Sequence, residues 1–236
     1  MNKKEQKKHI HKIIDKLKEH YPLAECSLDY NVGDAALSVP RSDEGVAPYN
    51  NDGEPYKLLI MARLSAQCTD ARVNIVAKDL FVEFKSIEDF AYADLEKLEK
   101  AIFSCGLYKT KAKNIKAMCR MIIDDFDSKV PEEMDDLLKL PGIGRKIANL
   151  IRGDIFNKPA IVTDTHCIRI SNRLDLADSD NPYKVEKQLV EIIPPEESSD
   201  FCHRLVLFGR EYCKSQNPRC GECFLREECS FRQGEN

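Results

Sequence analysis

Apolar residues recur along the chain with the three- and four-residue spacing that places them on one face of a helix. The clearest stripes are Ile10, Ile13, Ile14 and Leu17; Leu95, Leu98 and Ile102; Ile115, Met118, Cys119, Ile122, Ile123 and Phe126; Val185, Leu189, Ile192 and Ile193; and Phe201, Leu205, Phe208 and Tyr212. No segment alternates with the two-residue period of a half-buried strand. The pattern predicts an all-α fold of short helices joined by short loops.

Polar residues predict where several of these helices begin. Ser86, with Asp89 three residues later, has the spacing of a capping box. Pro131, followed by two glutamates, is expected in the first turn of a helix, and Asp164 is expected just before another. Residues 27–56 contain several glycines and prolines without a sustained period. They predict a long irregular insertion, which is either a lid or a surface loop without function.

Composition and charge narrow the class of protein. The longest uninterrupted apolar run, from Leu58 to Ala62, is far shorter than the roughly 18 residues of a membrane span. The Lys-rich N-terminus lacks the apolar region of a secretion signal. We therefore expect a cytoplasmic protein without a membrane span. The net charge of −4 also argues against an extended basic surface for nucleic acid.

A local basic surface is still predicted. No acidic residue lies between Ser104 and Arg120. That segment contains a basic stripe at Lys109, Lys111, Lys113, Lys116 and Arg120. Cations gathered on one helix can bind phosphate groups even when the whole chain is acidic.

The heptapeptide Leu140-Pro141-Gly142-Ile143-Gly144-Arg145-Lys146 lies between two segments with helical spacing, which predicts a helix, a tight hairpin and a second helix. Gly142 and Gly144 permit positive φ and close approach of the backbone, so the second helix can direct its first N–H groups at a phosphate. The spacing from the glycines to Lys146 does not match a P-loop. The hairpin therefore predicts a sequence-independent DNA clamp, with a simple glycine-rich turn as the alternative.

Lys146 and Asp164 are candidates for catalysis. Lys146 is expected in the first turn of a helix, where the dipole and burial against apolar neighbours would both favour a neutral, nucleophilic amine. Asp164 could accept a proton or stabilise positive charge on a sugar. Two simpler interpretations stay open, because Lys146 could be a phosphate ligand and Asp164 a helix N-cap.

Four of the ten cysteines lie close together near the C-terminus, at Cys213, Cys220, Cys223 and Cys229. Their density predicts a metal site, because a chain that resembles a cytosolic protein rarely uses cysteines for disulfides. Four thiolates can bind a zinc ion or a four-iron cluster, and the spacing does not choose between them. Lys214, Arg219 and Arg226 in the same loop could contact phosphate groups.

Five motifs in order along the chain resemble the endonuclease III family of the helix-hairpin-helix DNA glycosylases. They are Leu64-Ser65-Ala66-Gln67, Gly106-Leu107-Tyr108, residues 140–148, residues 162–173 and the four-cysteine loop. The resemblance implies a lyase with Lys146 as nucleophile and Asp164 as its essential carboxylate. It also implies a [4Fe–4S] cluster, rather than zinc, at the four cysteines.

The resemblance further implies two helical lobes with a DNA-binding cleft between them. One lobe is a six-helix barrel with the helix-hairpin-helix, at residues 57–158. The other combines residues 1–26 with 159–236 and includes the cluster loop at 213–229. Gln67 and Leu107 would wedge into the duplex where the damaged nucleotide is extruded. The other implied DNA-binding residues are Leu140, Pro141, Gly142, Ile143, Gly144, Arg145, His166, Lys214 and Arg219.

The sequence therefore predicts a bifunctional DNA glycosylase and abasic-site lyase. We expect a monomer that acts on double-stranded DNA containing oxidised pyrimidines or abasic sites, in the cytoplasm and at the nucleoid if the source is bacterial. Lys146 would form an imine with the sugar, and β-elimination would break the strand on the 3′ side. The alternatives are a monofunctional glycosylase in which Asp164 activates water, a non-catalytic module that binds damaged DNA, and an electron carrier.

Overall fold

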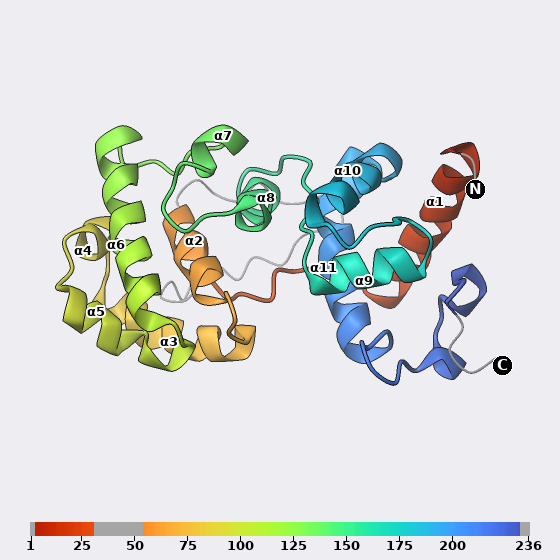
Figure 1. The fold of residues 1–236 in the computed structure, drawn as a ribbon, viewed down its shortest axis with the longest axis horizontal. Helices are drawn as coiled ribbons and strands as arrows, with labels where there is room; N and C mark the ends of the chain where they lie inside the picture. Colours follow the sequence, from red (N-terminus) through yellow and green to blue (C-terminus); the bar gives the residue numbers. More distant parts are fainter. Residues whose placement is uncertain (1–2, 31–53, 232–236) are drawn as a thin grey trace. The chain divides into compact units, whose positions relative to one another are not determined.

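The computed structural model describes residues 3–30 and 54–231, and within these ranges the chain forms helices and loops without a β-strand (Figure 1). The predicted all-α class is confirmed. Most of the predicted insertion, residues 31–53, lies outside the described residues. No helix in the described ranges is long and apolar enough to cross a membrane.

The chain divides into two compact units. We call Cys26–Asn157 the hairpin unit, and Met1–Glu25 together with Lys158–Asn236 the cysteine-loop unit. Each is described separately below.

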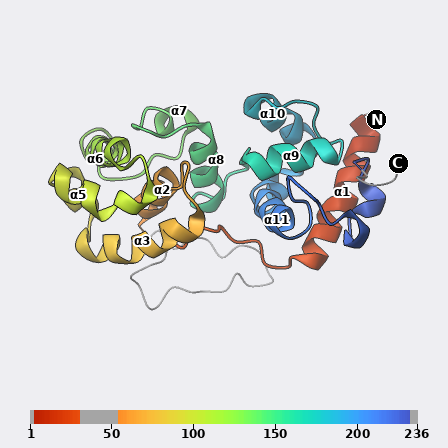
Figure 2. The same ribbon diagram turned by 60° about the horizontal axis from the view of Figure 1, so that its bottom comes forward.

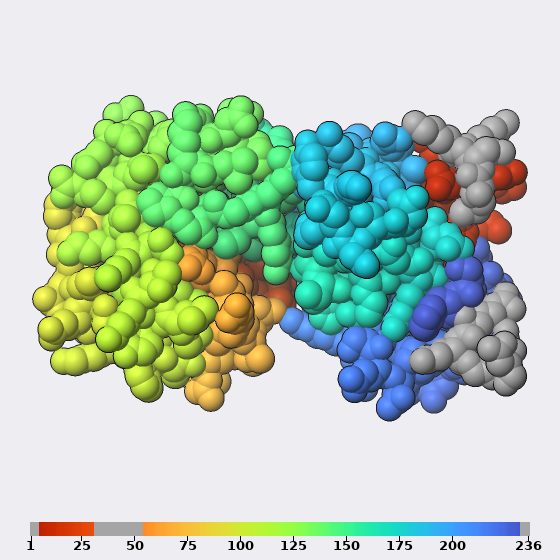
Figure 3. Space-filling model, viewed as in Figure 1, coloured from red at the N-terminus to blue at the C-terminus, as the bar shows by residue number. Residues whose placement is uncertain are grey.

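The helices of the hairpin unit surround α2. In chain order they are α2 (Pro55–Leu64), α3 (Asp70–Glu83), α4 (Ile87–Ala91), α5 (Leu95–Ala101), the 3-10 turn η1 (Phe103–Cys105), α6 (Tyr108–Asp125), α7 (Met134–Leu137) and α8 (Arg145–Asp154). Four consecutive α2 residues, from Leu58 to Met61, are fully buried. Because consecutive residues point around a helix, α2 is buried on every side. It packs against α3, α6 and α8, and side chains of α6 form much of the hairpin-unit face seen in Figure 3.

Two predicted helix starts in this unit have different outcomes. Ser86 and Asp89 form the predicted capping box, since Ser86 Oγ accepts from Asp89 N at 3.2 Å and Asp89 Oδ2 accepts from Ser86 N at 3.1 Å. The helix start at Pro131 is wrong. Glu133 keeps an extended backbone (ψ 142°) as the N-cap of α7, so the helix cannot begin before it. The predicted irregular segment also ends earlier than residue 56, because Pro55 occupies the first turn of α2, where its missing N–H costs nothing.

The cysteine-loop unit joins the N-terminal helix to the C-terminal part of the chain. It contains α1 (Lys3–His20), α9 (Thr165–Arg173), α10 (Pro182–Ile192), η2 (Pro195–Glu197), α11 (Ser198–Glu211), η3 (Cys220–Glu222) and η4 (Arg226–Glu228). The predicted stripe of α1, from Ile10 to Leu17, is buried. Helix α11 packs against both α1 and α9 (Figure 2). Both helices therefore pack on the helix that leads into the cysteine loop.

Candidate functional site

The predicted helix-hairpin-helix is present in the hairpin unit. Helix α7 ends at Leu137, and α8 begins at Arg145 with Gly144 as its N-cap. Gly142 has the expected positive φ of 81°. Gly144 does not use the positive φ that glycine permits: its φ is −105° and its ψ is 174°, because an N-cap residue takes an extended backbone.

The two glycines serve different purposes. A Cβ at Gly142 would lie 2.6 Å from Arg63 Nε. Among the described residues, by contrast, no atom apart from those of Gly144 and its chain neighbours lies within 4 Å of the place where a Cβ of Gly144 would be. Gly142 therefore allows the hairpin to pack on α2. Gly144 leaves open space beside the first N–H groups of α8, and having no side chain it cannot cap them itself. These features fit a helix terminus that receives an anion from outside the protein.

Two side chains that the sequence analysis missed, Arg63 and Asn114, lie against the hairpin at Gly142. Arg63 of α2 donates to Asn114 Oδ1 of α6 through Nη2 at 2.9 Å and Nε at 3.3 Å. Asn114 Cβ is also 3.0 Å from where a Cβ of Gly142 would be. Nothing in the local sequence marks either residue, because the contact joins three elements that are distant along the chain.

The predicted hairpin residues divide into anchors and exposed groups. Leu140 and Ile143 are buried, so their side chains are not available to a ligand. Arg145 and Lys146 are exposed. Lys146 is the second residue of α8, as predicted, but the burial expected for it is wrong. The apolar face of α8 is formed by other positions, which begin with Ala148 and Ile151.

Asp164 lies in the cysteine-loop unit, as the N-cap of α9. Its Oδ1 accepts from Cys167 N at 2.7 Å, so the simpler interpretation of this residue as a cap is correct. The cap uses one carboxylate oxygen, and the half-buried side chain retains Oδ2 for other chemistry. The buried segment before Asp164 is held by α11. Ala160 N donates to Ser198 Oγ at 2.9 Å, and Val162 N donates to Cys202 Sγ at 3.3 Å.

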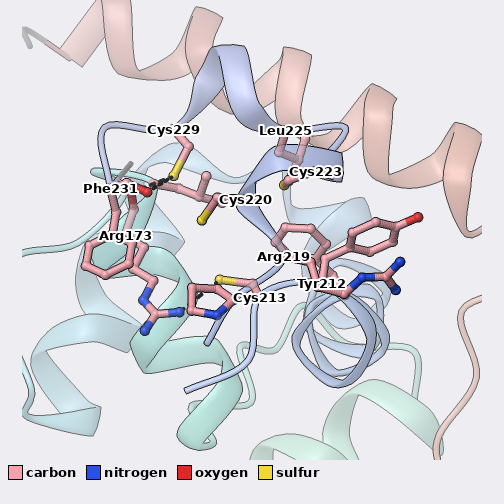
Figure 4. A pocket seen from close by; sticks show the side chains of 12 residues that line it. Arg173, Tyr212, Cys213, Arg219, Cys220, Cys223, Leu225, Cys229 and Phe231 are labelled. Atoms are coloured by element: carbon pink, nitrogen blue, oxygen red, sulfur yellow. Dashed lines mark hydrogen bonds between the residues drawn. The ribbon is translucent and has the colours of Figure 1, made fainter. Parts of the chain in front are cut away.

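The four clustered cysteines line one cavity, as Figure 4 shows. The rest of its wall is Arg173, Leu174, Phe208, Tyr212, Pro218, Arg219, Leu225 and Phe231. All four thiols are free of disulfides. Burial raises the pKa of the Cys223 thiol to about 11, and it also raises the pKa of Cys229. A cofactor with positive charge is therefore needed to hold these sulfurs as thiolates at neutral pH.

The four thiols supply the donor set of an iron–sulfur cluster. They line one shared cavity, and each iron atom of a four-iron cluster takes one thiolate. The donor set therefore fits a [4Fe–4S] cluster.

Two arginines of α9, also missed from the sequence, bind the cysteine loop. Arg173 Nη1 donates to Cys213 Sγ at 3.3 Å and to Lys214 O at 2.7 Å, and Arg169 Nη2 donates to Cys213 O at 2.8 Å. His166, one turn earlier, is packed against α11, since a Cβ at Gly209 would lie 2.3 Å from its Nδ1. Helix α9 thus carries Asp164 at one end and holds a predicted cluster ligand near the other.

The predicted basic surfaces need one correction. Lys111 is fully buried, because position 111 lies on the same face of α6 as the core residues Ile115 and Met118. Arg120 pairs with Asp124 at 2.6 Å. Lys109 and Lys113 remain exposed. In the cysteine loop Lys214 is exposed, and Arg219 pairs with Glu222.

The two residues expected to enter DNA are exposed on neighbouring loops of the hairpin unit. Gln67 follows α2 and has φ 56°, and Leu107 precedes α6 and has φ 48°. Leu107 is 56% exposed, and several other large apolar residues in the described part of the chain are exposed to a similar extent. Its exposure leaves an apolar group free to contact something outside the chain.

Comparison with known proteins gives a consistent result. The model of the HhH-GPD superfamily base excision DNA repair proteins matches residues 60–195, and that of the iron-sulfur binding domain of endonuclease III matches residues 213–229. The chain is 42% identical over 229 residues to endonuclease III from Bacillus subtilis, covering 97% of this chain and 94% of the relative.

Two solved structures are also similar. One is described as a non-covalent endonuclease III–DNA complex and the other as a trapped endonuclease III–DNA covalent intermediate. Each has a TM-score of 0.80 and 39% identity, and each match covers 98% of this chain and 96% of the other.

Proposed function

Because the chain belongs to the endonuclease III family within the HhH-GPD superfamily of base excision DNA repair proteins, we propose that Lys146 and Asp164 are its catalytic residues and oxidised pyrimidines its substrates. The activity is that of a bifunctional DNA glycosylase and abasic-site lyase, and the cysteine loop holds a [4Fe–4S] cluster.

The observation that carries the proposal is the position of Lys146. Lys146 is exposed in the first turn of α8, two residues after the N-cap at Gly144. A phosphate received by the N–H groups of this turn would bring the adjoining sugar close to the amine. A trapped covalent complex with DNA, as described for the similar structure, requires a nucleophile on the protein.

The proposed reaction begins when neutral Lys146 Nζ attacks C1′ of an extruded nucleotide. The C1′–base bond breaks and its electron pair leaves with the base. Asp164 stabilises the positive charge that develops on the sugar and accepts the proton released from nitrogen. Ring opening gives an imine between Nζ and C1′. Removal of a proton from C2′ then expels the 3′ phosphate by β-elimination, which cuts the strand.

Other residues would hold the DNA. Hairpin N–H groups would bind phosphate, except that of Ile143, which donates to Leu140 O at 3.1 Å. Gln67 and Leu107 would fill the gap left by the extruded nucleotide. Cys213, Cys220, Cys223 and Cys229 would hold the cluster, which when bound cross-links a loop that has little apolar core of its own. The exposed Lys214 would then be presented to the DNA backbone.

Borohydride trapping tests the assignment of the nucleophile. The protein is incubated with a duplex that carries one abasic site, and borohydride reduces any imine to a stable covalent link. Wild type and Lys129→Gln, which removes an exposed lysine outside the site, should both be trapped. Lys146→Gln should bind the duplex but form no covalent complex. Undiminished trapping of Lys146→Gln would assign the imine to another amine.

A further inference from the structure

Lys111 was predicted to belong to the basic stripe but is buried in the structure. It lies in the first turn of α6 and has no exposed surface. A lysine is rarely buried completely unless its ammonium group is paired or hydrogen-bonded. The groups that surround it therefore indicate what the residue does.

The ammonium group joins two helix ends. Lys111 Nζ donates to Leu64 O and to Cys105 O, each at 2.8 Å. Leu64 is the last residue of α2, and Cys105 is the last residue of η1. Carbonyls at a helix C-terminus lack donors within the helix and lie at the negative end of its dipole. One buried cation thus satisfies the ends of two separate elements.

The two loops that carry Gln67 and Leu107 start directly after those carbonyls. Gln67 and Leu107 both have left-handed backbone, with φ 56° and 48°, a conformation that residues other than glycine adopt only when their surroundings hold it. Lys111 also contacts the second loop through its own backbone, since Lys111 N donates to Leu107 O at 3.0 Å. The Lys111 side chain therefore holds both loops at their starts, while its backbone N–H makes the first hydrogen bond of α6, which any residue except proline could make.

We propose that Lys111 is a positioning residue, which fixes the Gln67 loop and the Leu107 loop relative to each other so that the two side chains enter the duplex together. The proposal rests on the wedge role given above to Gln67 and Leu107. A lysine suits the task because its apolar stem crosses the core while its ammonium group offers three donors in different directions. Methionine has a similar stem but no donor, so it would leave both carbonyls without a partner.

The test compares Lys111→Met with Lys100→Met, which removes an exposed lysine from α5 of the same unit. Extrusion is followed by stopped-flow fluorescence of 2-aminopurine placed beside a paired oxidised pyrimidine. Lys111→Met should slow extrusion roughly tenfold, the size of effect expected when buried acceptors lose their donor. Imine trapping at an abasic site, which needs no unpairing of a base, should change less than about twofold. Equal losses in both assays would overturn the proposal.

A double-mutant cycle separates positioning from general loss of stability. If Lys111 acts through the wedge, Lys111→Met should add little to the defect of Leu107→Ala, whereas an independent effect would multiply with it. A Leu107→Ala variant with normal extrusion would remove the wedge role itself. A large Leu107→Ala defect that multiplies with that of Lys111→Met would leave the wedge role standing and reject only the role of Lys111.

A second variant covers the outcome in which Lys111→Met does not fold. Lys111→Arg keeps a buried cation with several donors, but its planar guanidinium directs them differently. It should fold with a normal iron content and still extrude the nucleotide several-fold more slowly than wild type. A folded Lys111→Arg with wild-type extrusion and an unfolded Lys111→Met would together make Lys111 purely structural, which would overturn the proposal.

Discussion

Gly142 in the hairpin lies against Arg63 on α2, so closely that a Cβ at residue 142 would stand 2.6 Å from Arg63 Nε. Arg63 is held there by Asn114 on α6. The clamp proposed for DNA is therefore built on two helices that do not belong to it. Its two glycines should respond differently to the same substitution.

Gly142→Ala and Gly144→Ala form a matched pair. Gly142→Ala forces alanine into positive φ and into contact with Arg63, and it should lower the free energy of unfolding by about 2 kcal/mol. Gly144→Ala is compatible with φ −105° and with the open space around it, so stability should be unchanged. The added methyl would stand where the phosphate approaches, and duplex binding should weaken. Thermal unfolding and DNA titration of both variants measure this contrast. A loss of stability in Gly144→Ala without a loss of duplex binding would show that Gly144 serves packing instead.

Asp164→Asn and Asp164→Ala separate the cap from the chemistry. Asparagine caps a helix as well as aspartate does, so Asp164→Asn should keep the stability of wild type while its base release is slowed by orders of magnitude. Asp164→Ala should lose the same activity and also about 1 kcal/mol of stability. Single-turnover base release and thermal unfolding are measured for both. An active Asp164→Asn would show that Asp164 is only a cap.

Gln67→Ala and Leu107→Ala should affect substrates according to how firmly the lesion is paired. Unstacking the damaged nucleotide costs a few kcal/mol, and each variant removes contacts that offset part of this cost. Excision of a lesion opposite its normal partner should slow more than excision of a mismatched lesion, and cleavage at an abasic site should slow least. Single-turnover rates on the three duplexes measure this order. Equal losses on all three would indicate loop packing rather than a wedge.

Replacing one ligand of the cluster should remove iron and weaken DNA binding together. Wild type should contain about four iron atoms per chain and be brown. Cys223→Ser should lose most of this iron and bind duplex poorly, because the loop depends on the cluster for its structure. Cys119→Ala, which alters a buried cysteine of the hairpin unit, should keep its iron. Iron assay, absorption spectra and DNA titration test this, and a colourless wild type with one zinc would contradict it.

Cys119 should make the protein sensitive to alkaline pH. Burial raises the pKa of this thiol to about 12 from the ordinary thiol value of 9.0. Because the folded pKa is the higher one, the neutral thiol favours the folded state fully below pH 9, and this stability is lost as pH rises from 9 towards 12. The loss is roughly 1.4 kcal/mol per pH unit in that interval. In urea unfolding at pH 7.5 and pH 10.5, wild type should therefore lose more stability than Cys119→Ala, which cannot ionise. An equal loss in both would show that Cys119 is solvated.

The sequence by itself determined the features that depend on neighbours along the chain. The buried stripe of α1 follows from the helical period, the capping box at Ser86 from a three-residue spacing, and the four-thiol cofactor loop from the density of cysteines between Cys213 and Cys229. The helix-hairpin-helix was equally local, because glycines and two helical stripes lie within one short segment. Such patterns record which face of a helix is apolar and where the backbone can turn.

Only the tertiary structure decided what lies opposite each face. The sequence predicts Lys111 to be a surface cation. In the structure it lies at the C-terminal ends of α2 and η1, where two carbonyls accept its hydrogen bonds. No local pattern indicates a role for Arg173, but its position on α9 places it beside the Cys213 sulfur. The two hairpin glycines could not be told apart until Arg63 filled the space beside only one of them. In each case the deciding contact joins residues far apart in sequence. Local periodicity cannot predict such contacts, because it shows which face of a helix is apolar but not which polar group packs against a given side chain.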